Sequence, residues 1–198
     1  LDPGGFTLLL HFWTMISNEP FFLRLLPLIF FILSMVLVSR LSMIWFPKNH
    51  FISYFAGFIL LFSNLLKHYA FELRPYSMEM FTAILSLFLC YKIPLILKSK
   101  SYAITTGTLM AILLTSRYST ICTIFALGCM LFYQTFFKIK TRNSMLNFIY
   151  FSFPILISAL LIYFITLRNQ NPGATPPVYV DMLMFKTGSV LKILFNPI

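Results

Sequence analysis

The residues best suited to chemistry form one polar cluster near the middle of the chain. Ionisable side chains between apolar segments are costly in a membrane, and they tend to mark a binding site or a water-filled cavity. An arginine in such a place suits a phosphate group, because its planar guanidinium can bind two oxygens at once. The polar cluster consists of Lys67, His68, Tyr69, Glu72, Arg74, Tyr76 and Glu79.

Two further features add to the positive potential expected near the polar cluster. Pro75 suits the first turn of a helix, whose N-terminus carries a partial positive charge. Arg117 and Tyr118 fall on the same side of the membrane in the expected topology. Together these groups predict a site for the phosphate of a polyprenyl-phosphate sugar whose lipid tail lies between helices. The predicted phosphate ligands are Arg74, Arg117 and Lys67, and the predicted supporting residues are Tyr76, Tyr118, Glu79 and His68.

Each of these residues also has a purely structural interpretation. The basic side chains can anchor helix ends at the lipid headgroups. Glu79 in a first helical turn can complement the helix dipole. His68 can be a solvated loop residue, and the tyrosines can belong to an aromatic belt at the membrane surface. The sequence leaves both interpretations open.

The elements that must position this site are membrane helices. Of the 198 residues, 59% are hydrophobic and only 10% are charged, against about 25% charged residues in soluble domains. Such a chain has too little polar surface to cover itself in water. We therefore expect an all-α, polytopic membrane helical bundle that forms a single transmembrane domain over residues 1–198. Charges and prolines predict an interfacial helix at 4–18, six spans at about 20–44, 50–67, 75–91, 101–116, 118–137 and 143–167, and an external loop at 168–182.

The distribution of charge predicts which side the site faces. All five acidic residues of the chain fall on one side of the expected topology. The positive-inside rule places the opposite, basic side in the cytoplasm, so the polar cluster faces the periplasm or a lumen. The net charge of +10 does not predict nucleic-acid binding, because the basic residues punctuate apolar runs. The cytoplasmic set is Arg40, Lys48, Lys92, Lys98, Lys100, Lys138, Lys140 and Arg142.

Several classes of site are disfavoured by what the sequence lacks. It has no GxGxxG, no Walker-type phosphate loop, no HExxH and no GxSxG, which argues against nucleotide-driven chemistry in this chain. Cys90, Cys122 and Cys129 lie in apolar stretches without CxxC spacing, so we interpret them as packing residues. We expect no metal site and no cofactor.

Five short motifs, taken in order, carry a family resemblance. They are Asp2-Pro3-Gly4-Gly5-Phe6, Leu10-His11-Phe12-Trp13, Leu23-Arg24, Leu73-Arg74-Pro75-Tyr76 and Arg117-Tyr118. Over residues 1 to about 170 the chain resembles the GT-C superfamily of integral-membrane glycosyltransferases. The branch is the one similar to dolichyl-phosphate-mannose-protein mannosyltransferases, whose bacterial relatives modify lipopolysaccharide, lipid A or proteins. One departure is Gly4-Gly5, where the family prefers Pro-Leu.

The resemblance implies an inverting sugar transfer at the periplasmic face of a bacterial inner membrane. The donor would be a polyprenyl-phosphate sugar, and the acceptor a lipid, glycan or protein. Arg74 would stabilise the charge that develops on the departing phosphate, with Arg117 and Lys67 in support. The catalytic carboxylate of the family is expected upstream of Leu1, because the chain reads as a piece of a longer protein, and Asp2 is not assigned as the base.

Three other functions remain open on the sequence. A flippase or transporter for a lipid-linked glycan would share the apolar spans and the external basic cavity, although no convincing internal repeat supports it. An oligosaccharide ligase or polymerase would also bind lipid phosphate through arginine. A structural membrane subunit would have no active site. An additional span followed by an external Asp or Glu upstream of Leu1 would favour the transferase.

Overall fold

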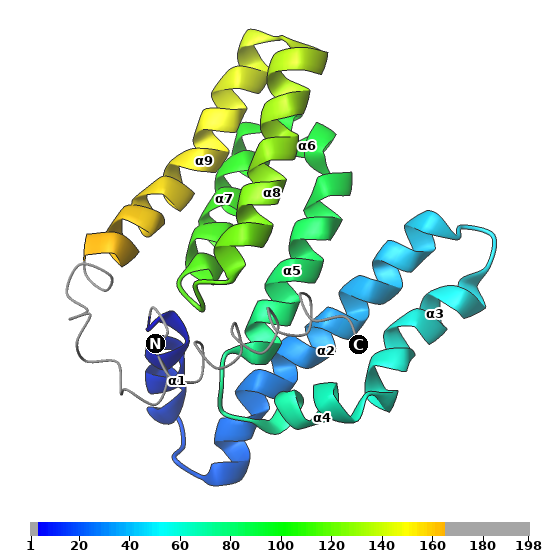
Figure 1. Cartoon of the computed structure of the whole chain (residues 1–198), viewed down its shortest axis with the longest axis vertical. Coiled ribbons are helices and arrows are strands. Elements are labelled where there is room, and N and C mark those ends of the chain that lie inside the picture. Colours follow the sequence, from blue (N-terminus) through cyan, green and yellow to red (C-terminus); the bar gives the residue numbers. More distant parts are fainter. Residues whose placement is uncertain (1–3, 165–198) are drawn as a thin grey trace, which may run out of the picture. The chain divides into compact units, whose positions relative to one another are not determined.

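The computed structural model of the protein describes residues 4–164, and all regular structure in that range is helical. Residues 4–160 belong to the first of two units into which the chain divides. The packing and the site lie within the first unit. The helices are α1 Gly5–Thr14, α2 Pro20–Trp45, α3 His50–Phe58, α4 Asn64–Phe71, α5 Tyr76–Tyr91, α6 Ile93–Lys98, α7 Lys100–Leu114, α8 Thr120–Tyr133 and α9 Arg142–Ile162 (Figure 1).

The all-α prediction is confirmed for the described residues. A short 3₁₀ helix at Ile59–Phe62 follows α3, and a π-helical turn at Gln134–Ile139 extends α8. The expected external loop at 168–182 and the end of the expected span at 143–167 lie outside the described residues.

Three helices in the described range are long and apolar enough to cross a membrane: Pro20–Trp45, Thr120–Ile139 and Arg142–Ile162. They correspond to the expected spans at 20–44, 118–137 and 143–167. Large apolar side chains such as Ile32, Phe125 and Leu156 are exposed on them, as expected where helices face lipid rather than water. These features indicate a membrane protein.

The other expected spans take a different form. The expected span at 50–67 is not one helix, because Ser63 adopts an extended conformation and its hydroxyl caps α4 by accepting from Leu66 N at 3.4 Å. The spans expected at 75–91 and 101–116 appear as α5 and α7, of 16 and 15 residues. Each is shorter than the roughly 20 residues that cross a typical hydrocarbon core. The structure thus confirms the helical class and leaves the count of six spans unconfirmed.

Close approaches between helices occur at glycines. A Cβ on Gly57 of α3 would lie 2.7 Å from the carbonyl oxygen of Met35 in α2, and one on Gly107 of α7 would lie 2.9 Å from Cα of Phe151 in α9. Small residues at such points let two backbones pack directly against each other, which is a common way to hold membrane helices together.

Polar side chains add hydrogen bonds between α9 and its neighbours α6 and α7. The Asn147 side chain of α9 donates to the carbonyl of Leu97 in α6 at 2.8 Å, and the Ser158 hydroxyl donates to the carbonyl of Ala111 in α7 at 2.8 Å. The ammonium of Lys100 also lies 4.7 Å from the ring centre of Tyr150. Two of the basic loops predicted to be cytoplasmic are therefore neighbours, at the junction of α6 and α7 and at the start of α9.

Candidate functional site

The link between α4 and α5 positions the centre of the polar cluster. Glu72 ends α4 in an extended conformation, and buried Pro75 precedes the first residue of α5. Proline has a fixed φ and no N–H, so it starts a helix without losing a hydrogen bond. This sharp entry places Arg74 just before α5, Tyr76 at its first residue and Glu79 in its first turn.

Glu79 ties α5 to the turn between α7 and α8. Arg117 Nη1 lies 2.5 Å from Glu79 Oε2, and the Ser119 hydroxyl donates to Glu79 Oε1. The Arg117 and Glu79 side chains are 33% and 28% exposed, so the pair is half-buried. The predicted interaction of Glu79 with the helix dipole is compatible with its place in the first turn of α5, and the ion pair with Arg117 gives it a second, tertiary role.

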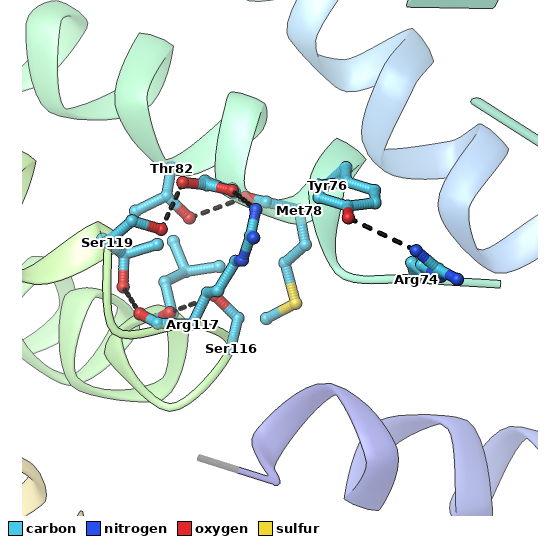
Figure 2. Close-up of polar contacts among 10 residues, drawn as sticks. Arg74, Tyr76, Met78, Thr82, Ser116, Arg117 and Ser119 are labelled. Carbon is cyan, nitrogen blue, oxygen red and sulfur yellow. Dashed lines mark hydrogen bonds and ion pairs between the residues drawn. The ribbon is translucent and has the colours of Figure 1, made fainter. Parts of the chain in front are cut away.

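Tyr76 lies between the two arginines of the predicted site. The guanidinium carbon of Arg117 is 4.6 Å from the Tyr76 ring centre, a cation–π distance. Arg74 Nη1 donates to the Tyr76 hydroxyl at 3.5 Å. Figure 2 shows Arg74 beyond the hydroxyl end of the tyrosine and Arg117 on its other side. The structure therefore brings Arg74, Tyr76 and Arg117 into one row, which we call the Arg–Tyr–Arg row.

Glu72 makes a second ion pair at the same place. Its carboxylate lies 3.0 Å from Arg74 Nε and 3.8 Å from His68 Nε2. The Arg74 and His68 side chains are 62% and 73% exposed. A pocket of about 340 Å³ adjoins this pair, and Arg24 of α2 contributes to its lining together with His68 and Glu72. The sequence analysis missed Arg24 as a site residue, although the Leu23-Arg24 motif at the start of a span was a signal for it.

The two ion pairs change the electrostatic interpretation of the site. Both arginines predicted as phosphate ligands face a glutamate, so the formal charges of Arg74 and Arg117 are balanced by those of Glu72 and Glu79. The attraction of the two arginines for an anion is therefore weaker than the sequence predicted. The Tyr118 side chain is half-buried in the turn beside Arg117, and the side chain of Lys67 lies outside the described part.

Helix α1 contacts the α7–α8 turn at its first residue and the start of α2 near its other end. Gly5 N donates to the carbonyl of Thr115 in the α7–α8 turn at 2.9 Å, and a Cβ on Gly5 would lie 2.5 Å from that oxygen. Gly4 has φ +87°, a conformation that favours glycine. At its other end Trp13 stacks on Phe22 and donates to the Phe22 carbonyl at 2.9 Å. The backbone at Gly4 and the close contact at Gly5 thus both favour glycine.

A second cavity, of about 240 Å³, opens next to the Arg–Tyr–Arg row. It lies between α2, α4 and the first two turns of α5, and the sequence analysis did not predict it. Its lining residues are Phe31, Leu66, Tyr76, Ser77, Glu79, Met80 and Ala83. Among the described residues no group of three His, Cys, Asp or Glu side chains is arranged to hold a metal ion.

No protein-family model, curated protein or solved structure matches this chain. The class that the fold defines is a helical membrane protein with a charge-balanced Arg–Tyr–Arg row at the start of one helix.

Proposed function

We propose that this chain is part of a membrane glycosyltransferase of the GT-C type. It would move a sugar from a polyprenyl-phosphate donor to a lipid, glycan or protein acceptor on the periplasmic or luminal side, in a bacterial inner membrane. The observation that supports this most directly is the Arg–Tyr–Arg row, which joins two guanidinium groups at one end of α5 in an apolar helical bundle.

Arg74 is the residue we assign to the donor phosphate. Its side chain is 62% exposed, so a headgroup can approach it from the membrane surface. A guanidinium stabilises the charge that develops on a phosphate as the sugar leaves. Arg117 is half-buried and paired with Glu79, which suits a positioning role through Tyr76. Lys67 and His68 remain supporting candidates.

The GT-C arrangement of about six crossings is part of this proposal. Under it, α5 and α7 cross the membrane although they have 16 and 15 residues. Short helices of this kind are accommodated when the bilayer thins locally or flanking side chains reach the interface. The segment from α3 to α4 would then cross as a broken helix, with Ser63 at the break.

The proposal is tested by sugar transfer in membranes that contain the protein at its natural length. We expect transfer from at least one polyprenyl-phosphate sugar, and Arg74→Ala should lower turnover by about 100-fold or more at unchanged protein level. Arg40→Ala is the matched control, because it removes an exposed arginine near the C-terminal end of α2. This variant should transfer sugar at the wild-type rate.

Two results would count against the proposal. Near-wild-type transfer by Arg74→Ala would remove Arg74 from the site. Movement of an intact lipid-linked glycan across the bilayer, without cleavage of its sugar–phosphate bond, would instead identify a flippase.

A further inference from the structure

A pocket of about 640 Å³ lies between α2 and α3, away from the polar cluster. Figure 1 shows α3 running back alongside α2 after the turn that joins them. Arg40, in the last two turns of α2, is one of the lining residues. From Arg24, which lines the pocket beside Glu72, to Arg40 the helix rises about 24 Å, at ~1.5 Å per residue. This cavity, which we call the α2–α3 pocket, therefore lies toward the opposite membrane surface.

The α2–α3 pocket changes from polar to apolar along its length. Arg40 and His50 line it near the turn between the helices, and Tyr54 follows one turn later in α3. Ile32, in the middle of α2, and Phe58, at the end of α3, line it farther from that turn. A phospholipid has the same order, because its charged headgroup lies at the membrane surface and its acyl chains extend toward the middle of the bilayer.

The positive charge of the α2–α3 pocket is not balanced by an acid. Arg40 forms no ion pair with any residue in the described part of the chain, whereas both arginines of the Arg–Tyr–Arg row lie beside a glutamate. No acid occurs between Glu19 and Glu72 in the sequence. Lys48, exposed in the turn between α2 and α3, adds a second positive charge at the same surface. An anion would therefore be attracted to this end of the pocket.

The surroundings of the pocket favour a lipid over a soluble anion. Ile32 and Val36 are exposed on a helix that is long and apolar enough to cross a membrane, so this end of the pocket opens onto hydrocarbon. The Arg40 guanidinium can bind two phosphate oxygens, and the His50 ring and the Tyr54 hydroxyl offer further hydrogen-bond donors. Basic pockets between membrane helices on the cytoplasmic side bind the headgroups of anionic lipids.

We propose that the α2–α3 pocket binds an anionic phospholipid, with its phosphate at Arg40 and an acyl chain against Ile32 and Val36. The lipid would come from the leaflet that the positive-inside rule places at the cytoplasm. It would neutralise Arg40 and fill the space between α2 and α3. The site is distinct from the proposed sugar-transfer site and does not depend on that proposal.

The test measures which phospholipid the natural-length protein retains in detergent. The protein receives equal amounts of phosphatidylglycerol and phosphatidylcholine with identical acyl chains, and native mass spectrometry counts the bound molecules. The wild type should retain phosphatidylglycerol about tenfold or more over phosphatidylcholine. Arg40→Gln should lower that preference about fivefold, the equivalent of ~1 kcal/mol for one basic residue near an anionic headgroup.

One variant and one competitor complete the design. Arg142→Gln removes an exposed arginine at the start of α9, on the same predicted membrane surface but outside the pocket, and should keep the preference. Glycerol phosphate carries the same phosphate without acyl chains and should not displace the bound lipid even in large excess. Both arginines are exposed, so both variants should fold, and melting temperatures equal to that of the wild type check this.

Three results would overturn the proposal. A wild type that does not prefer phosphatidylglycerol has no such site. Equal losses in Arg40→Gln and Arg142→Gln would show that the preference follows net charge rather than the pocket. Displacement by glycerol phosphate would identify a site for soluble anions. None of these results bears on the glycosyltransferase proposal, because a lipid at Arg40 takes no part in the transfer reaction, and Arg40→Ala remains the control for that assay.

Discussion

At the scale of single residues, the two ion pairs of the site differ in burial although their chemistry is the same. Arg117 and Glu79 are half-buried, whereas Arg74 is mostly exposed beside Glu72. Exposed pairs are screened by water and salt, and they contribute about 0–1 kcal/mol to stability. The half-buried pair has less water around it, and the Ser119 hydroxyl supports it. We therefore expect the Arg117–Glu79 pair to contribute more to the stability of the fold. Arg74 is the arginine that a ligand can reach more easily.

This difference predicts two unequal double-mutant cycles. In the cycle of Arg117→Gln with Glu79→Gln, we expect a coupling free energy of about 1–2 kcal/mol in thermal unfolding of the detergent-solubilised protein. In the cycle of Arg74→Gln with Glu72→Gln, we expect less than about 0.5 kcal/mol. Equal couplings would show that the two pairs have the same structural weight, contrary to this assignment.

The sequence predicted which ionisable residues lie at the candidate site, but it could not predict which of them form ion pairs. Arg74, Arg117 and Glu79 stand out because ionisable residues are rare in so apolar a chain. The partnership of Arg117 with Glu79 joins positions 38 residues apart and depends on how the α7–α8 turn meets α5.

At the scale of elements, glycines show which helix contacts are tight. A Cβ on Gly107 of α7 would lie 2.9 Å from Cα of Phe151, whereas one on Gly128 of α8 would meet nothing within 4 Å. Both glycines lie inside helices, where alanine is intrinsically favoured by about 0.5–1 kcal/mol. The local surroundings therefore decide whether a glycine-to-alanine substitution raises or lowers the free energy of unfolding.

We predict opposite effects for the same substitution at these two positions. Gly107→Ala should lower the free energy of unfolding by about 1–3 kcal/mol, because α7 and α9 must separate. Gly128→Ala should raise it by about 0.5–1 kcal/mol. Melting of the purified protein in detergent measures both, and a stabilised Gly107→Ala variant would mean that α7 and α9 do not pack as closely as the structure has them.

The sequence predicted element type better than element continuity. Apolar runs bounded by charges correctly located the long helix α2 and the start of α9. The run at 50–67 contains no Lys, Arg or acid before Lys67, so nothing in its charge pattern marks a break. The break depends on the extended backbone of Ser63 and on its hydroxyl, which accepts a hydrogen bond from Leu66 N. A hydropathy pattern carries no information on either.

At the scale of the whole molecule, the proposed orientation gives a labelling prediction. After the native cysteines are replaced by serine, a cysteine at Asn18, an exposed position between α1 and α2, should react with a membrane-impermeant maleimide in intact spheroplasts. A cysteine at Lys140, an exposed position in the turn before α9, should react only after permeabilisation. The reverse pattern would place the polar cluster in the cytoplasm, away from a periplasmic or luminal acceptor.

Tyr76 connects the polar cluster to elements outside it. One face of its ring holds Arg117, and its hydroxyl accepts from Arg74. Arg117 lies two residues after Thr115, whose carbonyl accepts from the first residue of α1. An unbroken line of contacts thus leads from an exposed guanidinium to the helix at the start of the chain. Under the proposed function, a headgroup that displaces Arg74 would loosen its 3.5 Å hydrogen bond to Tyr76, the residue that also contacts Arg117 in the turn that holds α1.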